Sequence, residues 1–248
     1  MRLTIDSDRQ QLLIDEGQGE KALPLYSKEA YERLSRWWVR MGWANKVSYD
    51  YTWLGRPIIQ LPEDLVRLQE LVFTVKPDLI IETGIAHGGS AVFFASMLQL
   101  LGNDGRVVSV DIEIRPHNRA AIEAHPMSKK ITMIEGSSTA PEIVAQVKRH
   151  VKPGAKVLVI LDSNHTKKHV ADELELYAPL VTKGSYIVAT DGIMLDLYDV
   201  PGGKPEWKDD HPTAAAAEFA KTHPEFTIDP HWTRSGVTYF PGAYLKRA

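Results

Sequence analysis

Cysteine is absent from the 248 residues of this chain. Disulfide bridges, thiolate metal sites and a cysteine nucleophile are therefore excluded. Long apolar runs are absent too: none approaches the roughly 20 residues of a membrane-spanning helix, and the first ten residues lack the apolar segment of a signal peptide. We therefore expect a cytoplasmic protein with no membrane span.

Strong charge of one sign is also lacking. The formal net charge is −3 and the pI is near 6.3. The positive clusters at 129–130 and 167–168 contain only two lysines each. Because such short clusters cannot follow a phosphate backbone, nucleic acid is not expected as a partner.

The chain is well supplied with apolar residues, which make up 44% of it and suffice for the core of one α/β domain. Apolar segments of strand length alternate with segments of helical periodicity from residue 78 onward. We expect strands at 79–83, 106–110, 131–135, 156–161, 185–190, near 226–228 and at 237–240, and helices at 62–75, 90–101, near 118–124, 141–150, 165–177 and 213–221. Continuously apolar strands joined by helices predict a doubly wound, mostly parallel seven-stranded sheet over residues 61–248.

Residues 1–60 precede this domain as an aromatic-rich extension, which we expect to be helical. It contains too many aromatic side chains to be left in water, so it should pack on the core, a partner subunit or a substrate. The aromatic residues are Tyr26, Tyr31, Trp37, Trp38, Trp43, Tyr49, Tyr51 and Trp53. A second irregular segment, residues 192–211, is long enough to suggest a functional or mobile loop.

A glycine-rich turn follows the first strand of the domain, in the order Glu82, Gly84, Gly88, Gly89 and Ser90. The glycines can adopt positive φ and let a ligand approach the backbone, while the helix that follows presents free N–H groups. Glu82 would repel a dinucleotide pyrophosphate but suits a ligand with an ammonium group. S-adenosylmethionine meets this description. His87, within the turn, would shape the turn or contact the cofactor.

Polar residues end the other strands, where ligands of open α/β sheets bind. Asp111 ends the second strand, and its carboxylate can accept both ribose hydroxyls of an adenosine, although NAD sites share this feature and an Asp here could instead cap the next helix. Ser137 and Ser138 follow the third strand.

Asp162 and Asp191 end two successive strands, so their carboxylates could meet. Such hard oxygens suit Mg²⁺, Mn²⁺ or Ca²⁺, although a lysine or a raised pKa would also relieve the repulsion, and Asp162 could simply cap a helix. His165 lies three residues after Asp162, where a neutral imidazole could take a proton from a hydroxyl.

Several motifs in fixed order resemble the cephalosporin hydroxylase/rhamnosyl O-methyltransferase family of class I methyltransferases. They are YTWLGR (51–56), IETGIAHGGS (81–90), IEGSST (134–139), LDSNHT (161–166), YAPLV (177–181) and GAYLKR (242–247). The resemblance implies S-adenosylmethionine, a divalent metal such as Mg²⁺, O-methylation of a sugar-like or natural-product hydroxyl, and a homo-oligomer. From the residues and the resemblance together, we expect the following sites. The cofactor should contact Glu82, Gly84, Ala86, His87, Gly88, Ser90, Asp111, Ser137, Ser138 and Asp162. The metal should bind Asp162, Thr190 and Asp191, and catalysis should use Asp162 and His165, the last being similar to a basic residue of catechol O-methyltransferases.

Two positions depart from the family pattern. Thr190 stands where many members have a glutamate, and this loss of charge should weaken metal binding. Ala140 stands where relatives often carry an aspartate. Two alternatives therefore remain: an inactive cofactor-binding scaffold, suggested by Thr190, and an NAD-linked oxidoreductase, disfavoured by Glu82 and by the absence of a G-x-G-x-x-G motif.

Overall fold

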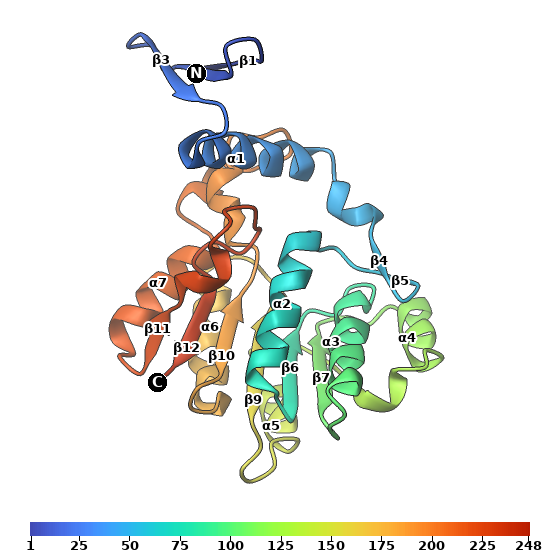
Figure 1. Ribbon diagram of the computed structural model, residues 1–248. Helices are drawn as coiled ribbons and strands as arrows, with labels where there is room; N and C mark the ends of the chain where they lie inside the picture. The colour runs from blue at the N-terminus through green and yellow to red at the C-terminus, as the bar shows by residue number, and fades with distance from the viewer.

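A seven-stranded sheet forms the centre of the computed structural model, which describes residues 1–248 (Figure 1). The strand order is β11–β12–β10–β9–β6–β7–β8; β10 to β8 are parallel, and β12 is antiparallel to both its neighbours. The bounds are β6 Leu79–Thr83, β7 Arg106–Asp111, β8 Ile131–Glu135, β9 Val157–Leu161, β10 Tyr186–Ala189, β11 Phe226–Ile228 and β12 Tyr244–Arg247. The doubly wound, mostly parallel sheet expected from the sequence is confirmed.

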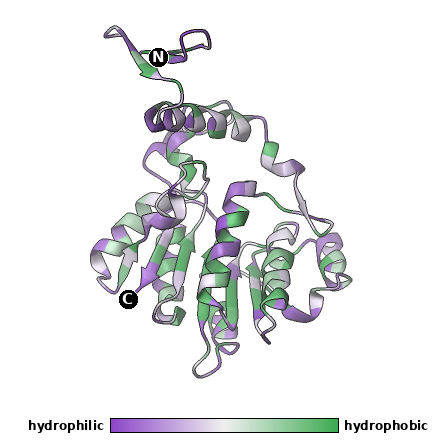
Figure 2. Ribbon diagram, viewed as in Figure 1, coloured by the Kyte–Doolittle hydropathy of each residue, from purple (hydrophilic) through white to green (hydrophobic).

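Helices cover both faces of this sheet. On one face, α2 and α3 pack with Ile80 and Leu158, and on the other, α5, α6 and α7 pack with Ile81 and Val159. Neighbouring strand residues thus point to opposite cores, as alternation along a strand requires. Figure 2 shows the strands as an apolar layer. The helices are α2 Pro62–Val75, α3 Gly89–Leu100, α4 Pro116–Glu123, α5 Pro141–Lys148, α6 Lys167–Tyr177 and α7 Pro212–Thr222.

The strand expected at 237–240 is wrong, because the final strand is β12. The main-chain N–H of Tyr239 donates to Asp64 Oδ2 at 2.7 Å, and that of Phe240 donates to Thr238 Oγ1 at 2.9 Å. Side chains therefore take the bonds that a strand ladder would need. The apolar character of this segment reflects burial in the core, not strand pairing.

The N-terminal extension is helical only in part, which corrects the expectation for residues 1–60. Its beginning is a separate antiparallel sheet of β1 (Arg2–Asp6), β2 (Gln11–Asp15) and β3 (Glu20–Pro24). Helix α1 (Lys28–Ala44) follows and lies between this small sheet and the main domain (Figure 1). The segment then passes through a short 3-10 helix, Val47–Asp50, and a small hairpin of β4 (Thr52–Trp53) and β5 (Arg56–Pro57).

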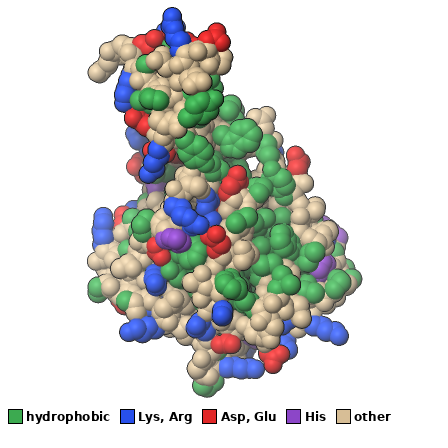
Figure 3. Space-filling view, in the orientation of Figure 1, with side chains coloured by type: hydrophobic (Ala, Val, Ile, Leu, Met, Phe, Trp, Pro, Cys, Tyr) green, Lys and Arg blue, Asp and Glu red, His purple; other side chains and the backbone are tan.

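The aromatic residues of the extension divide into two groups. Trp43, Tyr51 and Trp53 pack against the main core. Tyr26 and Trp38 are 84% and 65% exposed, and Figure 3 shows hydrophobic side chains gathered over α1. No helix combines the length and apolar character needed to cross a membrane.

Candidate active site

A cavity of about 710 Å³ opens beyond the carboxyl ends of the parallel strands, and a second of about 50 Å³ adjoins it. This is where ligands of open α/β sheets bind, and the larger volume is in the range of ligand pockets. The expected site residues that line one or both cavities are Gly84, Ala86, His87, Ser90, Asp111, Ser137, Ser138, Asp162, His165 and Asp191. Three expected residues, Glu82, Gly88 and Thr190, line neither.

The glycine turn brings β6 against the end of β9. Gly84 has φ +96°, and a β-carbon there would lie 1.9 Å from the carbonyl oxygen of Asp162, so only glycine fits. Gly88, at φ +81°, caps α3. Gly89 does not have the expected positive φ; it begins α3, and a β-carbon there would lie 2.2 Å from the carbonyl oxygen of Pro57.

Asp111 holds the turn from the neighbouring strand. Its Oδ2 accepts the main-chain N–H groups of Ile85 at 2.7 Å and Ala86 at 3.1 Å, while Oδ1 accepts from Glu113 at 3.2 Å. The alternative of a cap on the next helix is excluded, because Arg115 is the N-cap of α4. Asp111 also lines the larger cavity, so contact with a ribose stays a prediction that the geometry allows.

Glu82 is completely buried. Its Oε2 accepts from the Ser109 hydroxyl at 2.7 Å, and its Oε1 has no hydrogen-bond partner. Burial raises the pKa of Glu82 to about 8, against the lowering effect of the Ser90 and Ser109 hydroxyls. The group is therefore largely protonated near neutral pH, which weakens the argument that its negative charge attracts an ammonium group.

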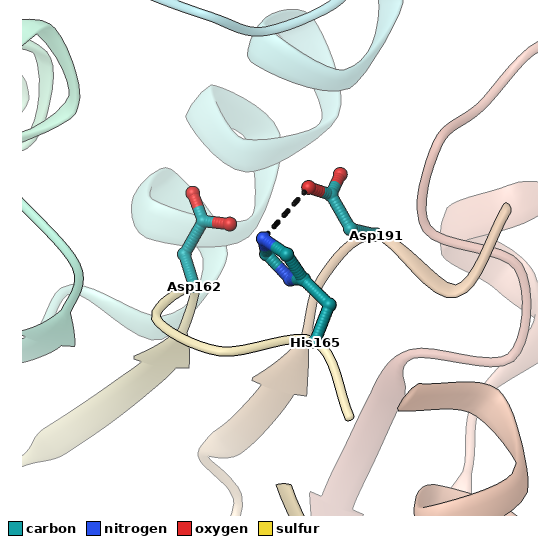
Figure 4. Close-up of side chains that lie close together, drawn as sticks. All are labelled: Asp162, His165 and Asp191. Carbon is teal, nitrogen blue, oxygen red and sulfur yellow. Dashed lines mark ion pairs between the residues drawn. The ribbon is translucent and has the colours of Figure 1, made fainter. Parts of the chain in front are cut away.

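Asp162, His165 and Asp191 converge at the edge of the cavity (Figure 4). One ligand atom from each side chain lies within 4.8 Å of the others. His165 Nε2 is 3.4 Å from Asp191 Oδ2, and it comes from the loop after β9 because α6 begins only at Lys167, with Thr166 as its N-cap. Asp162 is therefore not a helix cap.

The two carboxylates of this cluster are disfavoured in their charged forms. Burial, followed by the charge of Asp191, raises the pKa of Asp162, and burial also raises the pKa of Asp191. His165 opposes both shifts. Two carboxylates held this close favour either a proton or a bound cation.

Thr190 and Gln60 hold the Asp162 carboxyl between them. The buried hydroxyl of Thr190 donates to Asp162 Oδ1 at 2.6 Å and approaches the carbonyl oxygen of Leu161 at 3.0 Å. Gln60 Nε2 donates to Asp162 Oδ2 at 3.1 Å. Thr190 thus positions a carboxylate, and its expected part in metal binding stays a prediction.

A partly buried polar network centred on His169, which the sequence did not reveal, supports the other side of the cavity. His169 Nε2 lies 3.2 Å from Ser138 Oγ and 3.1 Å from Ser163 Oγ, and 3.4 Å from Oε1 of the buried Glu173. The bond to Glu173 raises the pKa of His169 despite partial burial. Residues 169 and 173 lie one helical turn apart. Because this spacing is common in helices, it did not identify them as site residues.

Arg56 and Asn118 hold the glycine turn from outside. The Arg56 Nε donates to the His87 carbonyl oxygen at 3.0 Å, and Asn118 Nδ2 donates to that of Ala86 at 2.9 Å. Arg56 lies in one of the recognised motifs, whereas Asn118 had no sequence signal.

The outer wall of the larger cavity comes from the extension and the 192–211 segment, through Tyr49, Met194, Lys204 and Trp207. The Trp207 ring meets Trp43 edge-on, with centroids 5.6 Å apart, and Lys204 Nζ lies 6.0 Å from the Trp207 centroid. The 192–211 segment, expected to be functional or mobile, therefore forms part of the cavity.

Comparison with known sequences gives consistent matches. The family described as rhamnosyl O-methyltransferase/CmcI matches residues 45–248. A rhamnosyl O-methyltransferase of Mycobacterium leprae is 36% identical over 162 residues, covering 64% of this chain and 66% of the relative. One from Mycobacterium tuberculosis H37Rv is 31% identical over 177 residues, covering 70% and 68%. The matched region thus spans about two thirds of each relative's length.

Solved structures share the fold at low sequence identity. CmcI, described with magnesium and S-adenosylmethionine, has a TM-score of 0.57 and 15% identity, covering 81% of this chain and 77% of that one. An O-methyltransferase from Bacillus cereus has a TM-score of 0.50 and 18% identity, covering 82% and 84%.

Proposed function

The chain belongs to the rhamnosyl O-methyltransferase/CmcI family, and from this membership we propose that it transfers the methyl group of S-adenosylmethionine to a hydroxyl of a sugar-like acceptor. The observation that carries the proposal is the meeting of Asp162, His165 and Asp191 beside the glycine turn, at one edge of the larger cavity. A proton acceptor and two carboxylates thus adjoin the place where a nucleoside cofactor would lie.

The residues of the turn fit this cofactor. Asp111 lines the cavity, and after the three main-chain bonds it accepts, its Oδ1 keeps one lone pair for a ribose hydroxyl. The start of α3 offers free N–H groups to a carboxylate. S-adenosylmethionine carries its methyl on a sulfonium, so the protein has mainly to align the acceptor and remove its proton. An NAD-linked reaction lacks support, because the turn has no G-x-G-x-x-G motif and the relatives described above are O-methyltransferases.

Within this cluster, Asp162 and Asp191 also fit a divalent cation, with Mg²⁺ the favoured ion, and His165 is left free to accept a proton. Each oxygen of Asp162 accepts one bond, from Thr190 or Gln60, and so keeps a lone pair for a metal. A cation bound there would acidify and orient an acceptor hydroxyl. Thr190 supplies no charge, so binding should be weaker than at a site with three carboxylates.

His165 acts as the general base in this proposal. Its Nε2 faces the cluster, and Asp191 stabilises the imidazolium that forms when the ring accepts the hydroxyl proton.

The acceptor would bind along the outer wall of the cavity. Trp207 and Tyr49 present aromatic surface of the kind on which sugar rings stack. A sugar hydroxyl also agrees with the name of the curated relatives.

A homo-oligomer in the cytoplasm completes the proposal. Its support is the exposed apolar surface of α1 (Figure 3), together with the edge strands β1 and β3 of the small N-terminal sheet (Figure 1). Light scattering of the wild type and of Trp38→Glu tests it: dissociation of an oligomer by the substitution supports the contact, and a monomeric wild type contradicts it.

Methyl-labelled S-adenosylmethionine offered with deoxysugar glycosides, catechols, amines and nucleic acids tests the activity. Mass spectrometry should locate the label on a sugar oxygen. Label on nitrogen or nucleic acid would overturn the proposal, and label on catechols alone would keep the reaction but remove the sugar. Loss of S-adenosylmethionine affinity in Asp111→Ala, measured by calorimetry, should accompany it.

Chelation tests the metal separately. Exhaustive chelation should lower turnover, Mg²⁺ should restore it, and Thr190→Glu should raise metal affinity by adding a charge. Full activity of the metal-free protein would remove the metal from the proposal.

A further inference from the structure

Gln60 is a buried side chain that connects the smaller cavity to the charged cluster. It lies between β5 and α2 and is only 6% exposed. Its Nε2 donates to Asp162 Oδ2 at 3.1 Å, so the direction of the amide is set: a reversed amide would place its oxygen against a carboxylate oxygen.

The other end of the same amide has no partner. Gln60 Oε1 is buried and accepts no hydrogen bond. A buried acceptor without a donor destabilises a folded protein, so most buried acceptors have a hydrogen-bond partner. Gln60 lines the 50 Å³ cavity, which it shares with Gly84, Ser90 and Asp162.

The lining of this small cavity indicates which donor fits. No lysine or arginine lines it, and Asp162 is its only carboxylate, so the site favours a positive donor. The start of α3, at Gly89 and Ser90, forms another wall, where helix N–H groups favour a carboxylate. A group with an ammonium and a carboxylate on one carbon matches both walls.

We propose that Gln60 Oε1 accepts a hydrogen bond from the α-ammonium group of the cofactor's methionine part, while its Nε2 holds Asp162. This assignment rests on the proposed function and gives Gln60 the role that the sequence suggested for Glu82, whose carboxyl lines neither cavity. One side chain then links the cofactor to the carboxylate beside the reacting hydroxyl, so Gln60 both binds the cofactor and positions Asp162.

Calorimetry with three ligands tests the contact. S-adenosylhomocysteine carries the amino acid, its deamino analogue lacks only the amino group, and 5′-methylthioadenosine lacks the whole amino-acid part. Gln60→Leu should weaken S-adenosylhomocysteine binding roughly 10- to 100-fold, the usual value of a bond to a charged group, and should leave 5′-methylthioadenosine affinity unchanged. The exposed Gln99→Leu is the matched control.

The deamino analogue completes a double-mutant cycle, in which the amino group of the ligand and the Gln60 side chain are removed separately and together. Removing the amino group should weaken binding to the wild type by a similar factor and to Gln60→Leu by little. Equal losses in both proteins would overturn the inference, as would equal wild-type affinity for the two ligands if Gln60→Leu does not fold. Failure of the wild type to bind any adenosine ligand would instead overturn the proposed function.

Discussion

The two sides of the larger cavity, which we propose bind the cofactor and the acceptor and call the cofactor side and the acceptor side, are built differently. On the cofactor side, main-chain bonds within the sheet place the residues: Gly84 N–H donates to the Val110 carbonyl oxygen at 2.7 Å, and Asp162 N–H donates to that of Thr83 at 2.8 Å. On the acceptor side, side-chain contacts hold together segments far apart in the chain. Arg36 bonds Asp196 through Nη2 at 2.6 Å and Nε at 3.1 Å.

This difference suggests that the reaction is determined on one side of the cavity and the choice of acceptor on the other. A strand end cannot move without disturbing the parallel sheet, so the cofactor side suits a fixed reaction. Exposed ion pairs contribute little to stability, so the segments that carry Tyr49 and Trp207 can change sequence without loss of the fold. We infer that the acceptor is selected by the extension and by residues 192–211.

The largest expected effect lies where the two sides meet, at His165. His165→Asn should lower methyl transfer by roughly two to four decades, the usual contribution of a general base, and should keep cofactor affinity. Single-turnover kinetics and calorimetry measure the two quantities, with the exposed His117→Asn as control. An unchanged rate would assign His165 to structure alone.

The next largest effect is expected at Glu82, a buried residue on the cofactor side. Its folded pKa of about 8 lies above the ordinary 4.5, so its stabilising contribution is complete below about pH 4.5 and is lost as the pH rises through about 8. Between these values the free energy of unfolding should fall by about 1.4 kcal/mol per pH unit through this group.

The substitution Glu82→Gln removes the titrating carboxyl, and with it this fall in the free energy of unfolding. Its free energy of unfolding relative to the wild type should rise from pH 5 to pH 8, as measured by urea titration. The exposed Glu20→Gln should show no such trend. A pH-independent difference for Glu82→Gln would mean that the carboxyl is already ionised in the folded protein.

Trp207 tests the acceptor side. Trp207→Ala should raise the KM for the acceptor about tenfold, since the ring would lose its stacking contact, and should leave S-adenosylhomocysteine affinity unchanged. The exposed Phe73→Ala, on α2, is the control. If cofactor affinity falls as much as acceptor binding, the division between the two sides does not hold.

The smallest effect is expected at Ala140, a departure from the family pattern. Ala140 is the N-cap of α5, and no side chain bonds the free N–H groups there. Ala140→Asp should raise the free energy of unfolding by about 1 kcal/mol through capping, with turnover unchanged. A change in turnover would place this position in the site.

Much of the candidate site was predictable because strand ends of a parallel sheet meet at one edge. Asp111, Asp162 and Asp191 were identified from their positions after apolar segments, and all three line the cavity. Gln60 and Asn118 were not identified. Gln60 lies in an irregular segment and Asn118 in helix α4, and no local sequence motif distinguishes either residue.

The sequence by itself determined the elements whose periodicity is strong. Helix α2 has the expected bounds, Pro62–Val75, because a proline starts it and the restriction before Pro77 ends it. The expected bounds of strands β6 and β8 also match: all five residues of β6 are buried, whereas β8 is a partly exposed edge strand.

Only the tertiary structure decided the rest. It showed that Glu82 is sealed from the cavity, that Thr190 donates to Asp162, and that residues 237–240 bond to side chains instead of pairing as a strand. Each outcome depends on a partner far along the chain. Local sequence records the propensity and burial of a residue, whereas the partner of a polar group is set by which distant segments the fold brings together.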